Sequence, residues 1–395
     1  MKTICLHFHA HQSYKLKRYR FFNIGEEHCY ADNQVNTQQL ELVCKECYKP
    51  LNDILIKTSE KHGKKFKASL GISGILIKQL KDIKSTYLNS FCEIGKNENI
   101  EIVGEPFSNS LASLGDPKEF KRQIEKQKYI VEKLFNKKVK TFRNTSLLFS
   151  NSIAKDVADL GYESMLIEGA NNLLEWRSSN YLYCSNSAPS LKLFTRNQNI
   201  CAKILNTTGN LKKNVSEIIS EIKNQPHGDL INIFIDYEDL GAIDANKKRY
   251  LENFFNALCN DDSINLEMPT EISNYYECSG AIDISAPITS ANKKNNLSSW
   301  LDNELQREAF RQIYSMGDSL RQSNDYDLIN SWEMLQSADY LKEISTLSDD
   351  DNDNKTTFMN SPYDSFINYM NMISDLIIQA TNKQNIEVPK AFVKN

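Results

Sequence analysis

The sequence predicts an α/β fold in which a parallel sheet or a TIM-like barrel comes first and a helical region follows. Short apolar runs alternate with longer helical patterns over about the first 240 residues, and this rhythm is typical of parallel strands joined by helices. The run LINIFIDYE, residues 230–238, is apolar almost throughout, as expected of a strand that is covered on both faces. After about residue 290 the apolar residues recur at helical spacing.

The expected elements follow one another in a regular order. Strands are expected at residues 3–8, 65–73, 100–105, 140–145, 163–169 and 230–238, and helices between them at residues 38–63, 74–83, 116–136 and 150–162. The helix at 116–136 has the clearest start, because Asp116 is a good N-cap and Pro117 fits the first helical position. Gly63 is a typical helix end. Three further helical patterns, at residues 298–322, 325–345 and 361–382, make up the helical region.

Composition and charge argue against two kinds of partner. The 395 residues carry a net charge of −4, whereas binding of nucleic acid needs a concentrated basic surface. No apolar run approaches the roughly 20 residues needed to span a bilayer. The N-terminal stretch MKTICLHFHAHQ has histidines where a signal peptide keeps an apolar core. We therefore expect a cytoplasmic protein without nucleic-acid or membrane partners.

Cysteines and one acidic stretch give weaker signals. Nine cysteines are scattered through the chain, and their only close pair in sequence, Cys44 and Cys47, lies in a helical pattern. Because no second pair stands at zinc-finger spacing, ordinary reduced thiols are expected. The stretch SDDDNDNKTT, residues 348–357, is interpreted as a solvated connector, with a cation site as the alternative.

Polar side chains collect where the expected strands end. Active sites of parallel α/β barrels lie at the carboxyl ends of the strands. The polar groups at these ends are His9, His11 and Gln12, Glu105, Arg143 to Ser146, Glu168, and Asp236 with Glu238. Arg143, at the end of a buried strand, is expected to need an anionic partner, and no carboxylate lies beside it in the sequence.

Three chemistries fit parts of this set. His9 and His11 share one face of a strand and suit a metal-dependent hydrolase, although imidazoles that contact sugar hydroxyls also explain the pair. Asp236 ends a very apolar strand, where desolvation is expected to raise its pKa and suit it to general acid catalysis; a helix N-cap or a turn is the alternative. Ser146 lacks the G-x-S-x-G nucleophile elbow and an assigned base, which disfavours a serine hydrolase.

Several segments, taken in order, resemble the motifs of glycoside hydrolase family 57, in its α-amylase-like branch. HAHQ followed by LKRYRFFNIG resembles the first motif, VGEPFSNSLASL the second, TFRNTSLLFS the third and FIDYEDLGAI the fourth. SSWLDNELQREAF, SWEMLQSADY and SPYDSFINYM resemble the helical part that follows. The resemblance covers nearly the whole chain, and the order and spacing of the motifs make it specific.

The resemblance implies a fold, a substrate class and a division of the chain. The fold is an incomplete (β/α)7 barrel, TIM-like, in residues 1–285, with a C-terminal helical bundle in residues 286–395. Family members cleave or transfer α-glucan chains with retention and need no metal or other cofactor for the chemistry. A glutamate nucleophile and an aspartate acid/base flank the glycosidic bond, about 5–5.5 Å apart. An α-glucan or maltooligosaccharide is therefore the expected partner.

The sequence departs from the family pattern at the position that matters most for the reaction. Asp236 matches the acid/base, but Ser146 stands where the nucleophile glutamate is expected. The expected substrate contacts are His9, His11, Gln12, Glu105, Arg143, Asn144, Glu168 and the aromatic Trp176. Further departures from the family's motif residues fall at Ser13, Asn109, Ala242, Ile243 and Tyr340.

Three hypotheses remain open. The first is a family member that keeps the fold and a glucan-binding groove but has lost normal hydrolysis, because a short, neutral hydroxyl does not replace an anionic nucleophile. The second is an active α-glucan hydrolase or glucanotransferase in which Glu105, Glu168 or Glu238 is a substitute carboxylate, at an inverting separation of about 6.5–9.5 Å. The third is the metal-dependent hydrolase that uses His9 and His11.

Overall fold

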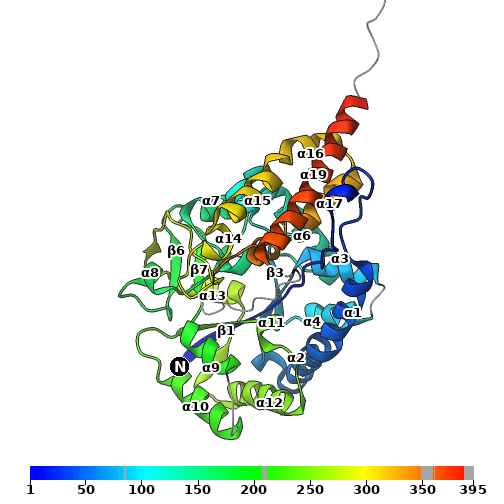
Figure 1. The fold of residues 1–395 in the computed structure, drawn as a ribbon. Helices are drawn as coiled ribbons and strands as arrows, with labels where there is room; N and C mark the ends of the chain where they lie inside the picture. The colour runs from blue at the N-terminus through cyan, green and yellow to red at the C-terminus, as the bar shows by residue number, and fades with distance from the viewer. Residues whose placement is uncertain (84–85, 207–210, 348–358, 360, 387–395) are drawn as a thin grey trace, which may run out of the picture. The chain divides into compact units, whose positions relative to one another are not determined.

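The computed structural model describes residues 1–83, 86–206, 211–347, 359 and 361–386 (Figure 1). The chain forms two compact units. Unit 1 comprises Met1–Gln12, Thr37–Phe107 and Gln123–Ser290, and unit 2 comprises Ser13–Asn36, Ser108–Arg122 and Ala291–Asn395. The domain division at residue 285 stays a prediction, and unit 2 takes in two segments from earlier in the chain. The acidic segment 348–357 lies outside the described residues.

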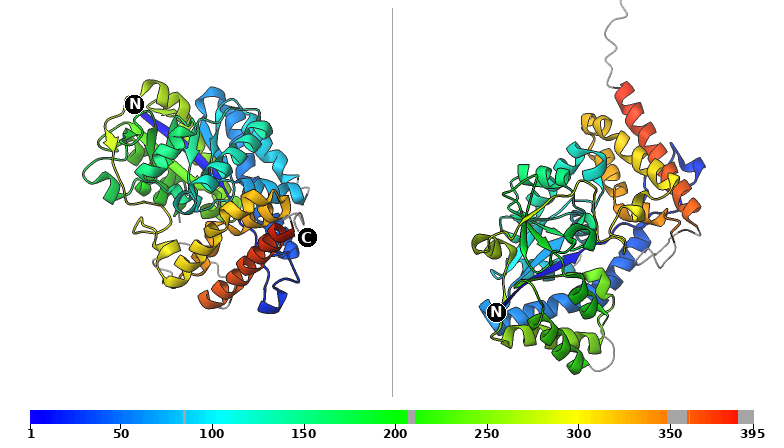
Figure 2. Two further views of the ribbon diagram at one scale, coloured as in Figure 1. Left: turned by 90° about the horizontal axis from the view of Figure 1, so that it is seen from above. Right: turned by 90° about the vertical axis from the view of Figure 1, so that its left-hand side faces the viewer.

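Unit 1 is built around a sheet in which seven consecutive strands are all parallel. Their order is β7-β5-β4-β3-β2-β1-β8. These strands are β1 Lys2–Ala10, β2 Ala68–Ile72, β3 Ile100–Gly104, β4 Thr141–Arg143, β5 Ser164–Ile167, β7 Lys192–Thr195 and β8 Leu230–Asp236. Figure 2 shows β1, drawn in dark blue, running through the middle of this unit with helices around it.

The two outermost strands of this row, β7 and β8, approach one another just beyond the end of β7. An isolated parallel bridge joins Arg196 to Asn232, and the Asn197 N–H donates to the Asn232 carbonyl at 2.9 Å. The Asn232 side chain donates in turn to the Thr195 carbonyl at 2.9 Å. The row of strands therefore curls into a barrel that is nearly closed, which confirms the predicted incomplete (β/α)7 fold.

Three short strands extend the sheet. β6, Leu182–Ser185, is antiparallel to β7, and β10, Ala281–Ile282, pairs with β6 in parallel. β9, Ile264–Leu266, pairs in parallel with β1. The sequence predicted none of these strands, nor β7, because runs this short do not show a pattern of alternation.

Apolar side chains fill the interior of unit 1, and helices cover the sheet. The interior cluster comprises Cys5, Val103, Leu147, Leu166, Leu182, Phe194, Leu230, Phe234 and Ile272. The longer helices before unit 2's bundle are α1 Asn33–Val43, α2 Lys49–His62, α3 Gly74–Asp82, α4 Tyr87–Lys96, α6 Pro117–Phe135, α7 Asn151–Asp159, α9 Gln198–Leu205, α10 Leu211–Lys223, α12 Ala245–Asn260 and α13 Pro269–Tyr275. Because the strands are buried on both faces, their ends are the places where polar groups reach solvent.

The first predicted helix, residues 38–63, is interrupted in the structure. A π-helical turn, Cys44–Tyr48, separates α1 from α2. Pro50, in the first turn of α2, has no N–H to donate to the Glu46 carbonyl. That carbonyl accepts the Ile243 N–H at 2.8 Å. The interruption thereby bonds this helix to the loop at Ile243, which follows β8 and the short helix α11, Tyr237–Leu240.

Unit 2 is largely helical, as the sequence predicts. Its helices of six or more residues are α15 Glu304–Ser315, α16 Gly317–Ser323, α17 Tyr326–Leu335, α18 Ala338–Glu343 and α19 Pro362–Ile386, and the short α14 is Ser298–Leu301. The single helix expected at 298–322 is thus divided into three. Asn303 accepts the Gln306 N–H at 2.8 Å while Gln306 accepts the Asn303 N–H at 3.2 Å, and this reciprocal capping begins a new helix. In the described ranges, no helix is long and apolar enough to cross a membrane.

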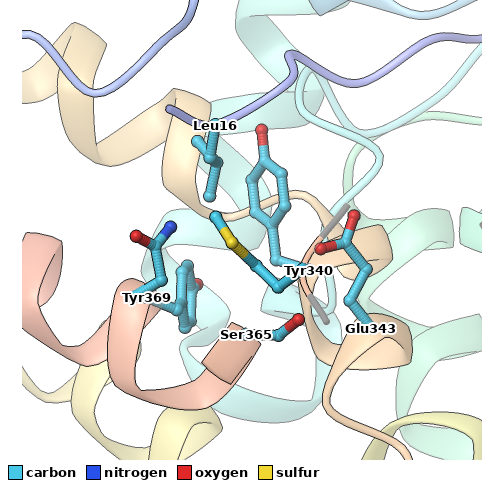
Figure 3. A pocket seen from close by; sticks show the side chains of 7 residues that line it. Leu16, Tyr340, Glu343, Ser365 and Tyr369 are labelled. Atoms are coloured by element: carbon cyan, nitrogen blue, oxygen red, sulfur yellow. The ribbon is translucent and has the colours of Figure 1, made fainter. Parts of the chain in front are cut away.

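A small pocket in unit 2 contains a carboxyl group with a shifted pKa (Figure 3). Its lining residues are Leu16, Tyr340, Glu343, Met359, Ser365, Asn368 and Tyr369. Burial raises the pKa of Glu343 to about 8; the Lys15 ammonium opposes this shift and the Asp339 carboxylate adds to it. The Ser365 hydroxyl is buried and has no hydrogen-bond partner among the described residues. Glu343 therefore holds its proton through neutral pH.

Replacing Glu343 with glutamine should flatten the dependence of stability on pH. The folded protein keeps a proton on Glu343 up to about pH 8, whereas an unfolded chain releases it near pH 4.3. The free energy of unfolding should therefore fall as the pH rises between these two values, by about 1–3 kcal/mol once partial exposure is allowed for. Urea unfolding of both proteins at about pH 5, 7 and 9 measures the difference, and identical pH profiles would contradict it.

Candidate active site

Four ionisable side chains at the carboxyl ends of β1, β3, β4 and β8 contact one another and form a charged cluster. Glu105 Oε2 lies 2.9 Å from His9 Nε2, and His9 Nδ1 lies 3.6 Å from Asp236 Oδ1. The Arg143 Nη2 group donates to both Asp236 oxygens, at 3.0 and 2.9 Å. The side chains of Glu105, His9 and Arg143 are at most 4% exposed, whereas that of Asp236 is 37% exposed. Asp236 is therefore the member that is most accessible to a ligand.

Strand register brings the charged cluster together. His9 and Asp236 are paired residues of the parallel neighbours β1 and β8. On the other side, His9 is paired with Gly71 of β2, and a Cβ atom at Gly71 would lie 3.2 Å from both Glu105 Oε1 and the His9 ring. The absence of a side chain at Gly71 thus leaves the space in which Glu105 reaches His9 from β3.

Asp236 is held as a carboxylate. Burial by itself would raise its pKa, but the Arg143 guanidinium and the hydrogen bond from His9 outweigh burial and hold the pKa well below the usual range. The expectation of a raised pKa for Asp236 is therefore wrong, because the sequence did not reveal its cationic partners. In the unliganded protein Asp236 is an acceptor for hydrogen bonds and is not poised as a proton donor.

His9 lies between two carboxylates and is stabilised in its charged form. Burial and the Arg143 charge lower its pKa, but Glu105 and Asp236 together outweigh them, so the pKa of His9 is raised. Both of its ring nitrogens face carboxylate oxygens. An imidazole held in this way is a poor metal ligand, because metals bind its neutral form. In the described part of the chain, no three histidine, cysteine or carboxylate side chains are arranged so that they could hold a metal ion together.

Exchanging Glu105 for glutamine should lower the pKa of His9 measurably. The change removes the anion that lies 2.9 Å from His9 Nε2 and keeps the shape of the side chain. Histidine titration by NMR measures the shift. Glu168→Gln is the matched control, since Glu168 is also a buried strand-end carboxylate but pairs with Arg196; an equal shift in both variants would contradict the role of Glu105.

Arg143 has its anion in the structure. No carboxylate lies beside it in the sequence, but folding brings the Asp236 carboxylate against it, and Arg143 Nη2 donates to both Asp236 oxygens. The Arg143 Nε–H is buried and has no partner among the described residues. The next residue, Asn144, accepts the Thr145 N–H at 2.9 Å and caps the short turn that follows β4.

Ser146 lies in that turn, Thr145–Leu147, with its backbone in the left-handed region at φ 44° and ψ 43°. This conformation costs a non-glycine residue on the order of 1 kcal/mol. Its carbonyl accepts hydrogen bonds from the Ser290 N–H at 2.8 Å, the Ser290 hydroxyl at 2.9 Å and the Thr289 hydroxyl at 2.7 Å. These three bonds hold the backbone of Ser146 in place. The side chain at this position is only the short, neutral hydroxymethyl group of serine.

The remaining predicted site residues have separate surroundings. Glu168 is buried and pairs with Arg196 Nη2 at 2.6 Å. The sequence did not point to Arg196, because Arg196 follows β7 and that strand was not predicted. His11 Nδ1 lies 2.8 Å from the Ser73 hydroxyl. The Gln12 carbonyl accepts from the Gln79 side chain at 2.7 Å. Glu105 and Glu168, two of the three candidate substitute carboxylates, are thus already engaged in ion pairs.

Trp176 lies on the surface of unit 1. It follows the short helix α8, Asn171–Leu174, and its side chain is 88% exposed. No ring contact or hydrogen bond joins it to the charged cluster among the residues that the structure describes. Its predicted contact with a sugar stays a prediction.

Comparison of sequences identifies relatives of this chain. The family model described as Glycosyl hydrolase family 57 matches residues 5–285. A putative alpha-amylase from Methanocaldococcus jannaschii is 27% identical over 396 residues, which cover 94% of this chain and 83% of that protein. The matched range contains the whole charged cluster and Ser146.

Solved structures share the fold. A GH57 branching enzyme from Thermococcus kodakaraensis has a TM-score of 0.73 at 11% identity, over 99% of this chain and 92% of that one. A 4-alpha-glucanotransferase from Thermococcus litoralis has a TM-score of 0.65 at 16% identity over 86% of this chain, which spans only 56% of that enzyme. At these identities the likeness shows the fold alone. Because the family model matches most of its length, the chain belongs to glycosyl hydrolase family 57.

Proposed function

We propose that this protein binds an α-glucan or maltooligosaccharide at the charged cluster and has lost normal hydrolysis. The proposal is carried by two observations: position 146 holds a neutral serine on a backbone fixed by three hydrogen bonds, and Asp236 is ionised. The family and its glucan-acting relatives supply the substrate class. A cytoplasmic location remains part of the proposal.

Both groups that the first step of a retaining reaction requires are impaired in this protein. The first step needs an anion to attack the anomeric carbon and a protonated acid to release the leaving group. Ser146 is neutral, and no hydrogen bond joins its hydroxyl to a histidine or carboxylate among the described residues. Asp236 is kept ionised by Arg143 and His9, so it has no proton to give. Cleavage therefore lacks its nucleophile and its acid at once.

The same groups are suited to hold a sugar. An ionised, partly exposed carboxylate such as Asp236 accepts hydrogen bonds from hydroxyl groups. The Arg143 Nε–H and the Gln12 side-chain oxygen are buried and have no hydrogen-bond partner among the described residues, so each would gain a partner only if the site opened slightly around a bound sugar. The site thus keeps hydrogen-bonding groups for a sugar but lacks the anionic nucleophile and the protonated acid needed to cleave a glycosidic bond.

Calorimetry and a reducing-end assay with maltooligosaccharides test the proposal together. We expect binding without release of reducing ends, and weaker binding in Asp236→Asn, because that change removes the anionic acceptor. Glu343→Gln, in the pocket of unit 2, is a control and should bind as the wild type does. Turnover that Asp236→Asn abolishes would instead support the active hydrolase or transferase with a substitute carboxylate. Absence of both binding and turnover would overturn the proposed function.

A further inference from the structure

The pocket of unit 2 is formed largely by two helices that pack against one another. Tyr340 and Glu343 are three residues apart on α18, and Ser365 and Tyr369 are four residues apart on α19, so each pair shares one helix face. Because α18 packs against α19, these two faces meet at the pocket (Figure 3). None of the lining residues belongs to the charged cluster, so the pocket is a different site from the one proposed to bind glucan.

The hydroxyl groups of the two tyrosines are already hydrogen-bonded to the backbone. The Tyr340 hydroxyl donates to the Tyr14 carbonyl at 2.8 Å, and the Tyr369 hydroxyl donates to the Leu335 carbonyl at 2.5 Å. The two rings are in contact, with centroids 5.8 Å apart and planes at 42°. The tyrosines therefore offer a ligand the faces and edges of their rings rather than their hydroxyl protons.

Two other polar side chains of the pocket have no hydrogen-bond partner. Ser365 is 5% exposed, and its hydroxyl is buried and unpaired within the described ranges. Glu343 is half-buried, and no residue that the structure describes forms a hydrogen bond with its carboxyl group. Figure 3 shows the Ser365 hydroxyl directed toward the side of the pocket where Glu343 lies. In proteins, a buried polar group of this kind commonly has a bound water or ion as its partner.

The surroundings of Glu343 favour a small cation. Burial keeps its carboxyl group protonated by raising the pKa, the Asp339 carboxylate adds to this effect, and the Lys15 ammonium opposes it. A bound cation would supply the positive charge that the ionised carboxylate needs, and the faces of aromatic rings also attract cations. The pocket has room for a group of about the size of a water molecule, which is the size of an ammonium group.

We propose that this pocket binds the ammonium group of a small primary amine, with Glu343 as its anionic partner and Ser365 as a hydrogen-bond acceptor. An ammonium group has three N–H donors, enough for the carboxylate and the hydroxyl together. An alkylammonium ion keeps its proton to about pH 10, as lysine does. Glu343 therefore releases its own proton to the solvent on binding, and a neutral carboxyl group and a free ammonium ion become an ion pair and a hydrated proton. The proposal does not depend on glucan binding.

Calorimetric titration of the full-length protein with methylammonium chloride tests the proposal. Because the pKa of Glu343 is about 8, binding at pH 7 should release about one proton per ligand, and the measured heat should differ between phosphate and Tris buffers. At pH 9 the carboxyl group is already ionised, so the release should nearly disappear and the affinity should be about tenfold higher. Sodium chloride and the larger tetramethylammonium chloride should give neither effect.

Three variants connect the heat to the pocket. Glu343→Gln keeps the size and the neutral state of the side chain, so it should fold, but it should lose both binding and proton release. Ser365→Ala should bind several-fold more weakly and still release one proton per bound ligand. Glu304→Gln, which removes a carboxylate that is 89% exposed in the same unit, should bind as the wild type does.

Three results would overturn the proposal. One is a wild-type protein that binds no methylammonium at millimolar concentrations, or binds it without releasing a proton at pH 7. Another is equal binding by Glu343→Gln, which would place the ligand elsewhere. The third is an equal response to sodium or tetramethylammonium, which would show a general attraction of cations instead of a pocket for a primary amine.

Discussion

Replacing Ser146 with glutamate should give the protein measurable hydrolysis of maltooligosaccharides. The variant restores a carboxylate to the turn after β4, whose backbone is already held by Thr289 and Ser290. Loss of a nucleophile typically costs on the order of 10⁴ to 10⁶ in rate. Recovery of even a small part of that amount, about 10² over the wild type, is readily detected as new reducing ends.

A second effect should favour this gain. A carboxylate at position 146, at the separation expected of a retaining pair, would repel the negative charge on Asp236. It would also compete for the Arg143 guanidinium, which donates to both oxygens of Asp236. The pKa of Asp236 should therefore rise toward the range in which a general acid works.

Two controls make the Ser146→Glu experiment specific. Ser146→Gln has the same size without the charge and should remain inactive. Addition of Asp236→Asn to Ser146→Glu should abolish the gained activity. If Ser146→Glu folds and binds glucan but stays inactive, the missing charge at position 146 is not what prevents hydrolysis. The explanation would then shift to the other motif departures, such as Asn109 and Tyr340.

Replacing Glu119 with alanine should destabilise unit 2 by about 3–5 kcal/mol. Glu119 is fully buried in α6 and accepts two hydrogen bonds from Arg122, at 2.8 Å each, and one from Gln336 at 3.0 Å. Arg321 lies 3.5 Å away, and both guanidinium groups lie over the Trp332 ring. Removal of the carboxylate leaves two part-buried cations with less counter-charge and opens a cavity beside them.

Urea denaturation measures this loss, and two variants calibrate it. Glu119→Gln keeps the shape and one acceptor, so its loss should be smaller than that of Glu119→Ala. Glu125→Ala, at an exposed position of the same helix, should change the free energy of unfolding by no more than about 0.5 kcal/mol. Equal losses at positions 119 and 125 would show that the buried ion pairs do not stabilise this unit.

Most of the barrel was predictable because its signals are local. The strands with long apolar runs, such as β1 and β8, and the capped helix α6 are present where the sequence indicated them. The short strands β6, β7, β9 and β10 were not predicted, since their formation depends on neighbours that supply hydrogen bonds. Arg196 escaped notice for the same reason: a residue at a strand end is recognised only when the strand itself is.

The sequence was sufficient to predict which positions make up the candidate site, but it was not sufficient to predict the ionisation states of their side chains. His9, Glu105, Arg143 and Asp236 were chosen because each ends a strand, and the structure joins them in one cluster. Their ionisation was not foreseen, because the pKa of Asp236 depends on Arg143 and His9, which come from other strands.

The sequence by itself determined the class of fold, the order of the family motifs and the hydroxyl at position 146. These follow from side-chain identity and from patterns within a few residues of one another. The tertiary structure alone decided that Arg143 pairs with Asp236 and that Glu105 reaches His9 past Gly71. Such pairs depend on strand register between distant segments. Electrostatic and hydrogen-bond energies fall steeply with distance, so only the folded chain fixes them.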